Sequence, residues 1–277
     1  MRHYLCLLLA AATALPAAAE PLRLLTFNVR FPSKGDGANL WELRRDLLVD
    51  TVRKLDPDVM GTQELFHEQG EYIVGKIPGL AWFGLSRRGN QQDEHMGVFY
   101  RKDKWKVAES GNFWLSETPE KPGSMSWDVT LPRMVTWALF QGQGSNRRFY
   151  LLNTHFPHRR EDERARVECA NVIADRMKTL PADVPVVLMG DFNAPAGGEA
   201  YRLLAATLQD SWDAAAEKEG PEGTFHGFSG KPGEARIDWI LFRGPWKARR
   251  ASSVTVNDGG RYPSDHFPVF AELDWIN

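Results

Sequence analysis

Asp191 and Asn193 are the first side chains in this sequence whose types and spacing could do chemistry. They follow the apolar run Val186–Met189, whose β-branched residues predict a strand buried on both faces. Positions i and i+2 on an extended segment point to the same side, so the strand end would offer a carboxylate and an amide together. Gly, Asp, Asn and Pro also form turns, so this window alone does not separate a site from a turn.

Asp238 is the strongest single anomaly, because it lies inside the otherwise apolar stretch Ile237–Leu241. Burial of a carboxylate there costs several kcal/mol unless the group is paired or hydrogen-bonded. His266 is the natural partner. An imidazole held through one nitrogen by a buried carboxylate has a fixed tautomer and a raised basicity, which suits proton transfer.

Polar side chains adjoin other apolar runs as well: Asn28, Glu64, His155 and Asp265. Each of them alone is typical of a turn or a solvated position. The oxygen ligands among them suit Mg²⁺ or Mn²⁺ and not a closed zinc site. Gathered at one rim of a sheet, these groups would form a site where a metal ion assists the attack of water on an anionic ester.

The elements that must position these groups form one α+β layered domain over residues 20–277. Strands are expected at Leu22–Val29, Val59–Gln63, Met96–Arg101, Arg133–Phe140, Phe149–Thr154, Val186–Met189, Arg236–Leu241 and Phe267–Leu273. Helices are expected at Trp41–Leu55, Glu161–Leu180 and Leu203–Leu208. Loops are expected at Ser86–Asp93 and Ser116–Pro132. Helices on the outer faces of two packed sheets would account for the number of strands.

Composition narrows the function. The chain is 43% apolar and 25% charged, which is ordinary for a globular protein, and its net charge of −2 excludes bulk affinity for nucleic acid. Positive charge for an anionic substrate must therefore be local, and the candidate substrate-binding residues are Arg133, Arg30 and Arg44.

The N-terminus predicts export. Arg2 and His3 precede an apolar run, and small residues follow at Ala17–Ala19, so residues 1–19 are interpreted as a signal peptide that is too short to anchor the chain in a membrane. We expect a periplasmic or secreted protein and a monomer. Cys169 alone would remain after cleavage, which excludes an intramolecular disulfide.

The ordered motifs TFNVR, GTQE, NTHF, GDFN, RIDWI and SDHFPV, spread over the mature chain, resemble those of the endonuclease/exonuclease/phosphatase superfamily, in particular its exported bacterial subgroup. These are deoxyribonuclease-like, metal-dependent phosphoesterases. The resemblance implies a four-layer αββα sandwich of two packed mixed β-sheets flanked by helices. It also implies a site where the loops of the two sheets meet.

The resemblance implies a role for each matching residue. Glu64 is expected to be the main metal ligand, with Asn28 beside it and Asp265 near the metal. Asp191 and Asn193 are expected to orient water and a phosphate oxygen.

For the remaining residues the resemblance is less specific. The resemblance implies that His266, held by Asp238, acts either as the general base or as a hydrogen-bond donor to the transition state, and these alternatives stay open. His155 resembles the phosphate-contacting histidine of the deoxyribonuclease branch, and Glu94 the acid that orients it. Arg30 stands where some nucleases of the superfamily carry an acid, which leaves one metal or two undecided.

The leading interpretation is thus an exported, Mg²⁺- or Mn²⁺-dependent hydrolase of a phosphodiester or phosphomonoester. Its substrate could be a small phosphate ester, a nucleotide or single-stranded nucleic acid, and nuclease, sphingomyelinase-like and phosphatase variants stay open. A secreted binding protein of the same fold would be expected to lack one of the key polar residues, and none is missing. Two carboxylates acting on a glycosidic bond would explain neither the amides nor the histidines.

Overall fold

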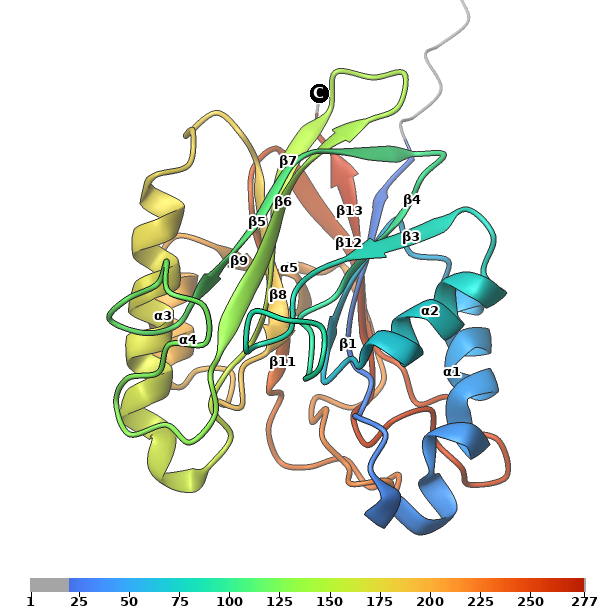
Figure 1. Ribbon diagram of the computed structural model, residues 1–277. Coiled ribbons are helices and arrows are strands. Elements are labelled where there is room, and N and C mark those ends of the chain that lie inside the picture. The colour runs from blue at the N-terminus through green and yellow to red at the C-terminus, as the bar shows by residue number, and fades with distance from the viewer. Residues whose placement is uncertain (1–19, 277) are drawn as a thin grey trace, which may run out of the picture.

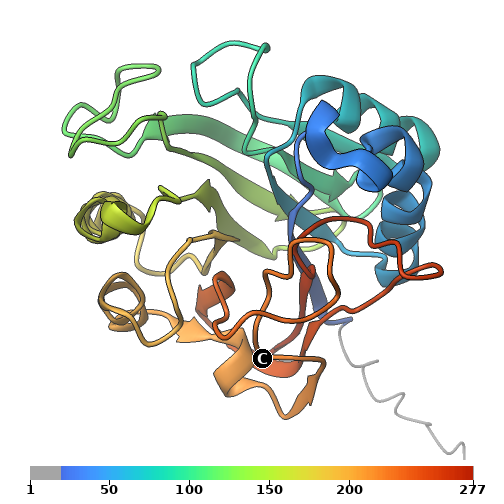
Figure 2. The same cartoon turned by 90° about the horizontal axis from the view of Figure 1, so that it is seen from below.

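The computed structural model describes residues 20–276, so the predicted signal peptide lies outside the described residues. Two mixed β-sheets pack face to face, with helices on both outer sides (Figure 1). Seen from below, α1 and α2 lie beside one sheet, and α3 and α4 lie beside the other (Figure 2). The predicted four-layer α+β sandwich is therefore confirmed.

The first sheet has the strand order β10-β12-β13-β1-β2-β4-β3. Its strands are β1 (Leu22–Asn28), β2 (Val59–Gln63), β3 (Leu80–Phe83), β4 (Val98–Arg101), β10 (Glu217–Glu219), β12 (Trp246–Ser253) and β13 (Val269–Trp275). Its outer face is covered by α1 (Trp41–Leu55) and α2 (His67–Lys76).

The second sheet has the order β5-β6-β7-β8-β11-β9. Its strands are β5 (Trp105–Trp114), β6 (Met134–Gly142), β7 (Arg148–His155), β8 (Val186–Asp191), β9 (Gln209–Asp210) and β11 (Asp238–Arg243). Its outer face packs on α3 (Glu163–Lys178) and α4 (Glu199–Ala205), while α5 (Ser211–Ala214), η1 (Lys34–Asn39) and η2 (Arg160–Asp162) are short.

The central strands are apolar on both faces because each separates two cores. In β8, Val187 and Met189 face the core between the sheets, while Val186 and Leu188 face the helices α3 and α4. This two-residue alternation is that of a strand buried on both sides, as predicted from the Val186–Met189 run.

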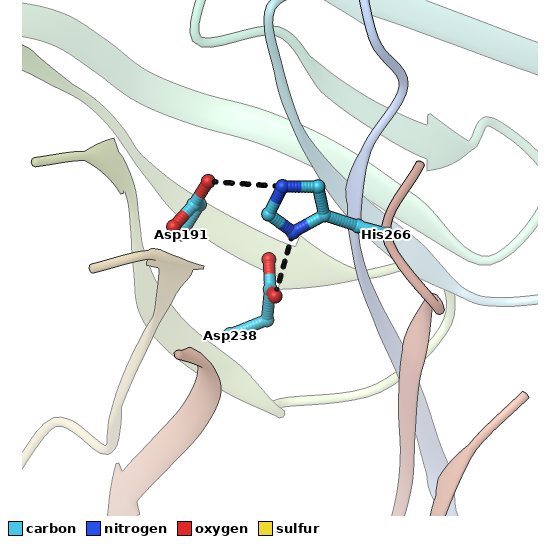
Figure 3. A group of neighbouring side chains, drawn as sticks. All are labelled: Asp191, Asp238 and His266. Carbon is cyan, nitrogen blue, oxygen red and sulfur yellow. Dashed lines mark hydrogen bonds and ion pairs between the residues drawn. The ribbon is translucent and has the colours of Figure 1, made fainter. Parts of the chain in front are cut away.

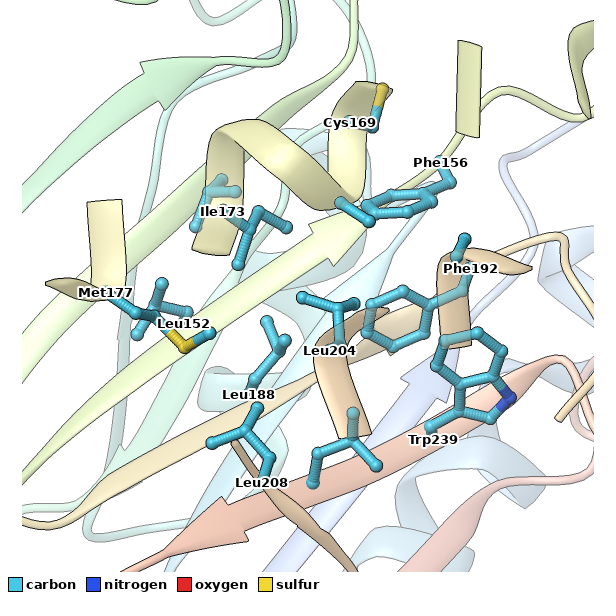
Figure 4. Packing of buried hydrophobic residues seen from close by; sticks show 14 of the residues in the cluster. Leu152, Phe156, Cys169, Ile173, Met177, Leu188, Phe192, Leu204, Leu208 and Trp239 are labelled. Carbon is cyan, nitrogen blue, oxygen red and sulfur yellow. The ribbon is translucent and has the colours of Figure 1, made fainter. Parts of the chain in front are cut away.

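The helix-side core of the second sheet continues to the end of β8 (Figure 4). Phe192 follows Asp191 and stacks on Trp239 with ring centroids 4.1 Å apart. Phe156 follows β7 and packs edge-on against Phe192 at 5.0 Å. These aromatic residues anchor the segments that carry the polar groups next to them.

The register of the strands aligns those polar groups. β7 and β8 are parallel, with His155 opposite Asp191, and β11 runs antiparallel to β8, with Asp238 opposite Asp191. In the first sheet β1 and β2 are parallel, with Asn28 opposite Gln63. The ends of four strands and the start of β11 therefore meet at one end of the sandwich.

Several elements differ from the sequence prediction. The third helix is Glu199–Ala205, earlier than the expected Leu203–Leu208, and α2, α5, β3, β5, β9, β10 and β12 were not predicted. Helix α2 contains two glycines, one of them packed against Trp82. β12 begins with buried residues alternating with the exposed Lys247 and Arg249, whereas β5 is exposed at Lys106 and from Ala108 to Ser110, so neither strand has a continuous apolar run.

Among residues 20–276, no helix has the length and apolar character needed to cross a bilayer.

Candidate active site

An open cavity of about 560 Å³ lies where β1, β2, β7 and β8 end and β11 begins. Most of the predicted site residues line it: Arg30, Glu64, Glu94, Arg133, His155, Asp191, Asn193, Asp265 and His266. Asn28 and Asp238 are buried directly behind this lining, at 1% exposure each, and contact Asp191 and His266. Segments from residue 28 to residue 266 thus supply one site.

The predicted pairing of His266 with Asp238 is present (Figure 3). His266 Nδ1 lies 2.9 Å from Asp238 Oδ2, and the other ring nitrogen, Nε2, lies 3.7 Å from Asp191 Oδ2. Burial opposes protonation, but the carboxylates of Asp238 and Asp191 outweigh it and raise the pKa of His266 to about 10. The imidazole is therefore a cation at neutral pH, with Asp238 as its buried counter-ion.

Asp191 stands at the centre of the polar groups. Its Oδ2 accepts a hydrogen bond from Asn28 Nδ2 at 3.0 Å and lies 3.5 Å from His155 Nε2. Burial, reinforced by the neighbouring Asp238 carboxylate, raises the pKa of Asp191 to about 7. A carboxylate of this kind can exchange a proton near neutral pH.

The predicted extended geometry of Asp191 and Asn193 is wrong. Asn193 has a left-handed backbone with φ 46°, and its N–H donates to Asp191 Oδ1 at 2.9 Å, so the chain turns directly after the strand. The Asn193 Nδ2 donates to the Phe156 carbonyl at 3.1 Å. Both side chains still line the cavity, because the turn, and not the pleat, directs the amide there.

Glu64, Asp265 and Asn28 form the group whose chemistry best fits a hard cation. Glu64 and Asp265 line the cavity, and directly behind them Asn28 Nδ2 donates to Glu64 Oε1 at 3.1 Å while Asn28 Oδ1 accepts from the Arg30 N–H at 3.0 Å. The Arg30 guanidinium approaches both acids, at 3.9 Å from Glu64 and 3.8 Å from Asp265. An all-oxygen donor set of this kind suits Mg²⁺ or Mn²⁺.

A second acidic group, Asp191, Asp238 and His266, also has ligand atoms within 4.8 Å of one another. Here, however, one nitrogen of the imidazole is bonded to Asp238 and the other faces Asp191. The positive charge of His266 already lies between these two carboxylates, so we favour Glu64, Asp265 and Asn28 as the metal-holding side.

The cavity lining also includes Arg87, Glu94, Arg133 and His158. Glu94 Oε2 accepts from Arg87 Nη1 at 2.8 Å, and burial, reinforced by the charge of Glu64, raises the pKa of Glu94 to about 7. Arg133 is only 3% exposed, and within the described chain its Nε and Nη1 donate to nothing. Unpaired buried donors in a cavity wall indicate a place for an anion.

The expected orientation of His155 by Glu94 is not found. Glu94 is bound by Arg87 instead, and Nδ1 of His155 has no hydrogen-bond partner among residues 20–276. Burial, reinforced by the charge of Arg133, holds the pKa of His155 well below its ordinary value. The neutral imidazole faces the cavity beside Asp191.

Arg44 does not line the cavity, so its predicted contact with substrate is corrected. It is fully buried and donates to the carbonyl oxygens of Asn39, Val29, Pro263 and Arg30. Burial lowers the pKa of Arg44 to about 10, where it remains charged at neutral pH. It holds together the backbone segments that carry Arg30 and Asp265.

Two motif residues without a predicted role connect the sheets beneath the site. Gln63 Nε2 of the first sheet donates to Asn153 Oδ1 of the second at 2.7 Å. The Asn153 amide in turn donates to the carbonyl oxygens of Thr62 and Gly97 at 2.9 and 3.0 Å. The approach is so close that a Cβ on Gly61 would stand 2.6 Å from Asn153 Oδ1.

Three of the seven described non-glycine residues with positive φ line the cavity. Arg30, Glu64 and Asn193 have φ values of 55°, 58° and 46°, which side-chain-bearing residues rarely adopt. Gly190, directly before Asp191, has φ 155°, and a Cβ there would stand 2.1 Å from the Thr154 carbonyl oxygen. Such strained positions persist where the surrounding contacts fix them, as at binding and catalytic sites.

Several known proteins are similar to this chain. The sequence profile described as "Endonuclease/Exonuclease/phosphatase family" matches residues 25–266. A mannosyl-6-phosphatase of Bacteroides thetaiotaomicron is 33% identical with a TM-score of 0.85, and the match covers 91% of this chain and 99% of that one. Mouse nocturnin is 23% identical, over 90% of this chain and 63% of its own. Tyrosyl-DNA phosphodiesterase 2 of Danio rerio is 25% identical, over 79% and 58%. The chain therefore spans less than two thirds of the last two relatives.

Proposed function

The chain belongs to the endonuclease/exonuclease/phosphatase family, and we propose that it is a divalent-metal-dependent hydrolase of phosphate esters, of monoesters in particular. The observation that carries the proposal is the convergence of oxygen donors, imidazoles and guanidinium groups from separate strands on one cavity. Groups of these types stabilise and transfer charge in the hydrolysis of an anionic ester.

The geometry assigns the catalytic groups different tasks. Asp191 lies beside Asn193 and faces the cavity, so it can accept the proton of an attacking water that the Asn193 amide helps to orient. His266 is flanked by Asp191 and Asp238, which keeps its imidazole protonated and able to donate to a phosphoryl oxygen. This favours His266 as the donor and not as the base.

A divalent ion held by Glu64, Asp265 and Asn28 would supply Lewis-acid polarisation of the phosphoryl group. Its fit rests on the carboxylates of Glu64 and Asp265 in the cavity lining, with the Asn28 amide directly behind them. Arg30 approaches the same two acids and adds a fixed positive charge at that side.

Two observations favour a monoester. The terminal phosphate of a monoester carries close to two negative charges at neutral pH, one more than a diester. Arg87 and Arg133 line the cavity, and Arg133 Nε and Nη1 have no hydrogen-bond partner among the described residues. The relative with 33% identity is named as a mannosyl-6-phosphatase, whereas the identities to nocturnin and the tyrosyl-DNA phosphodiesterase are 23% and 25%. A sugar phosphate is therefore the first substrate class to assay.

The decisive experiment compares esters and metals with one preparation of the protein. Phosphate release from mannose 6-phosphate and p-nitrophenyl phosphate is measured with Mg²⁺ or Mn²⁺ and with EDTA, beside bis-p-nitrophenyl phosphate and single-stranded nucleic acid. We expect metal-dependent hydrolysis of the monoesters at least about 10-fold faster than of the diesters. Faster hydrolysis of nucleic acid would identify a nuclease instead, and no turnover of any ester would refute the proposal.

Two variants make this experiment specific. Asp191→Asn should abolish turnover, whereas Asp274→Asn in β13, which is paired with the exposed Arg249, serves as the control for loss of an acid away from the cavity. Metal binding is also measured without turnover, since a ligand that binds only the folded state raises its melting temperature. Mn²⁺ should raise the melting temperature of the wild type and not that of Glu64→Gln.

We also propose that the protein is exported to the periplasm or the medium, because residues 1–19 have the pattern of a signal peptide. We further propose that it is a monomer. Cell fractionation followed by mass determination of the mature N-terminus tests the first, and light scattering tests the second. Retention of the full-length chain in the cytoplasm would contradict export.

A further inference from the structure

Phe225 is an exposed aromatic side chain on the lining of the candidate active site. Among the described large apolar residues that are exposed, namely Leu43, Met125, Phe225 and Ile276, it alone is aromatic and it alone lines the cavity. Its side chain is 46% exposed. An exposed Phe ring does not contribute the full stabilisation that its burial would give to the fold.

The backbone that carries Phe225 is tightly held. Thr224 and His226 on either side are buried at 0% and 5% exposure. The Phe225 carbonyl accepts from Gly233 N–H at 2.8 Å, and the His226 N–H donates to the Asp265 carbonyl at 2.9 Å. The Phe225 ring is thus presented to the cavity by a fixed segment and is not the tip of a loose loop.

The ring lies next to the catalytic histidine. Its centroid is 5.1 Å from that of His266, in an edge-to-face arrangement. A phosphate ester whose phosphoryl group reaches His266 would therefore bring its alcohol part within reach of the Phe225 ring. Leu131 and Ile237 add further apolar surface to the same lining.

Other aromatic side chains do not offer an equivalent surface. Phe31 also lines the cavity, but the Arg30 guanidinium lies over its ring at 4.4 Å. Three tryptophans in loops or strands of the chain, Trp82, Trp114 and Trp127, do not line the cavity. Trp82 stacks on Phe99 and Trp114 is buried, with its indole N–H donating to the Arg87 carbonyl.

We infer that Phe225 is a specificity-determining residue that stacks against the alcohol part of the substrate, and that the substrate is a phosphate ester of a ring-bearing alcohol. Sugars and nucleosides share the required feature, a ring with an apolar face that an aromatic side chain can cover. The inference rests on the proposed phosphoesterase function and deepens it, because it concerns which esters are preferred.

The test measures a preference and not activity alone. For the wild type, Phe225→Ala, Phe225→Leu and Phe225→Tyr, kcat/KM is determined with ring-bearing esters (mannose 6-phosphate and adenosine 5′-monophosphate) and with the ring-free glycerol 1-phosphate. In Phe225→Ala and Phe225→Leu the ratio of ring-bearing to ring-free kcat/KM should fall about 10-fold, mainly through KM, as expected for loss of a stacking contact. Phe225→Tyr should restore it.

Each outcome decides something. A fall of the ratio for the sugar ester alone, or for the nucleotide alone, supports the inference and identifies the ring. An unchanged ratio, or an equal loss with all esters, overturns it, since the latter would mean that Phe225 only supports His266. Met125→Ala, exposed but outside the cavity, controls for loss of an apolar side chain. Absence of turnover of all esters by the wild type would instead refute the proposed function.

Discussion

Replacement of Asp238 by Asn tests the pairing on which the proposed mechanism depends. The substitution keeps the size and shape of the side chain but removes the charge 2.9 Å from His266 Nδ1, in a position that is 1% exposed. Removal of one partner of a buried charge pair costs about 3–5 kcal/mol. If that loss falls on the transition state, kcat should drop by about 10²- to 10⁴-fold.

The activity deficit of Asp238→Asn should also depend on pH, which would not be expected if Asp238 had only a structural role. The carboxylates outweigh burial and raise the pKa of His266 to about 10, so the wild-type imidazole is protonated throughout the neutral range. Without the Asp238 charge, burial favours the neutral imidazole, and its pKa must fall. The protonated donor then forms only as the pH is lowered, so the deficit of Asp238→Asn should be larger at pH 8 than at pH 6.

Steady-state hydrolysis of a monoester from pH 5.5 to 9 and NMR titration of the His266 ring measure both effects, with thermal melting as the control for folding. Asp274→Asn again controls for loss of a carboxylate elsewhere. Near-normal kcat with an unchanged pH profile, or an imidazole pKa in the variant equal to that of the wild type, would show that Asp238 does not hold His266 protonated.

Two further predictions concern stability. Arg44→Met leaves four backbone carbonyl groups without their donor, so the free energy of unfolding should fall by at least about 3 kcal/mol and the melting temperature by about 6–12 °C; a melting temperature within 2 °C of the wild type would contradict this. Burial, reinforced by the charge of His266, lowers the pKa of His226 to about 4. The folded protein therefore favours the neutral imidazole, and this contribution to stability is complete above the unfolded pKa of about 6.5. It is lost as the pH falls from about 6.5 to about 4. The free energy of unfolding, measured with urea, should decrease between pH 7 and pH 4.5 in both proteins. In His226→Phe this decrease should be smaller than in the wild type by about 2–3 kcal/mol. Equal decreases would refute the assignment.

The strands that carry the site could be predicted because they are buried on both faces. The bounds expected from the sequence are those of the structure for the strand Val59–Gln63, and also for the helix Trp41–Leu55. The apolar run Val186–Met189 forms most of β8. Asp238 was recognisable because a carboxylate in an apolar strand requires a partner. Where a polar group interrupts an apolar run, sequence alone can therefore indicate a site.

The contacts across the cavity could not be predicted in the same way. Arg87 lies in a polar loop, and its pairing with Glu94 depends on how that loop folds back onto the strand ends. Asn193 was expected to be extended, but the hydrogen bond from its N–H to Asp191 turns the chain. The role of Phe225 could not be recognised, because the sequence alone does not distinguish an exposed aromatic residue from one that is buried in the core. Such features depend on tertiary contacts between segments far apart in the chain.

The hydrogen bond from Asn28 of β1 to Asp191 of β8 joins groups that belong to different sheets. The spacing of the catalytic groups is consequently set by the thickness of the apolar layer between the sheets, which is about 10 Å in packed sheets. A displacement of 1 Å can cost a catalytic site about 100-fold in rate. Substitutions in that layer, at Phe140 or Met189 for example, would therefore alter turnover without touching the substrate, and an interior redesign that preserves stability need not preserve catalysis.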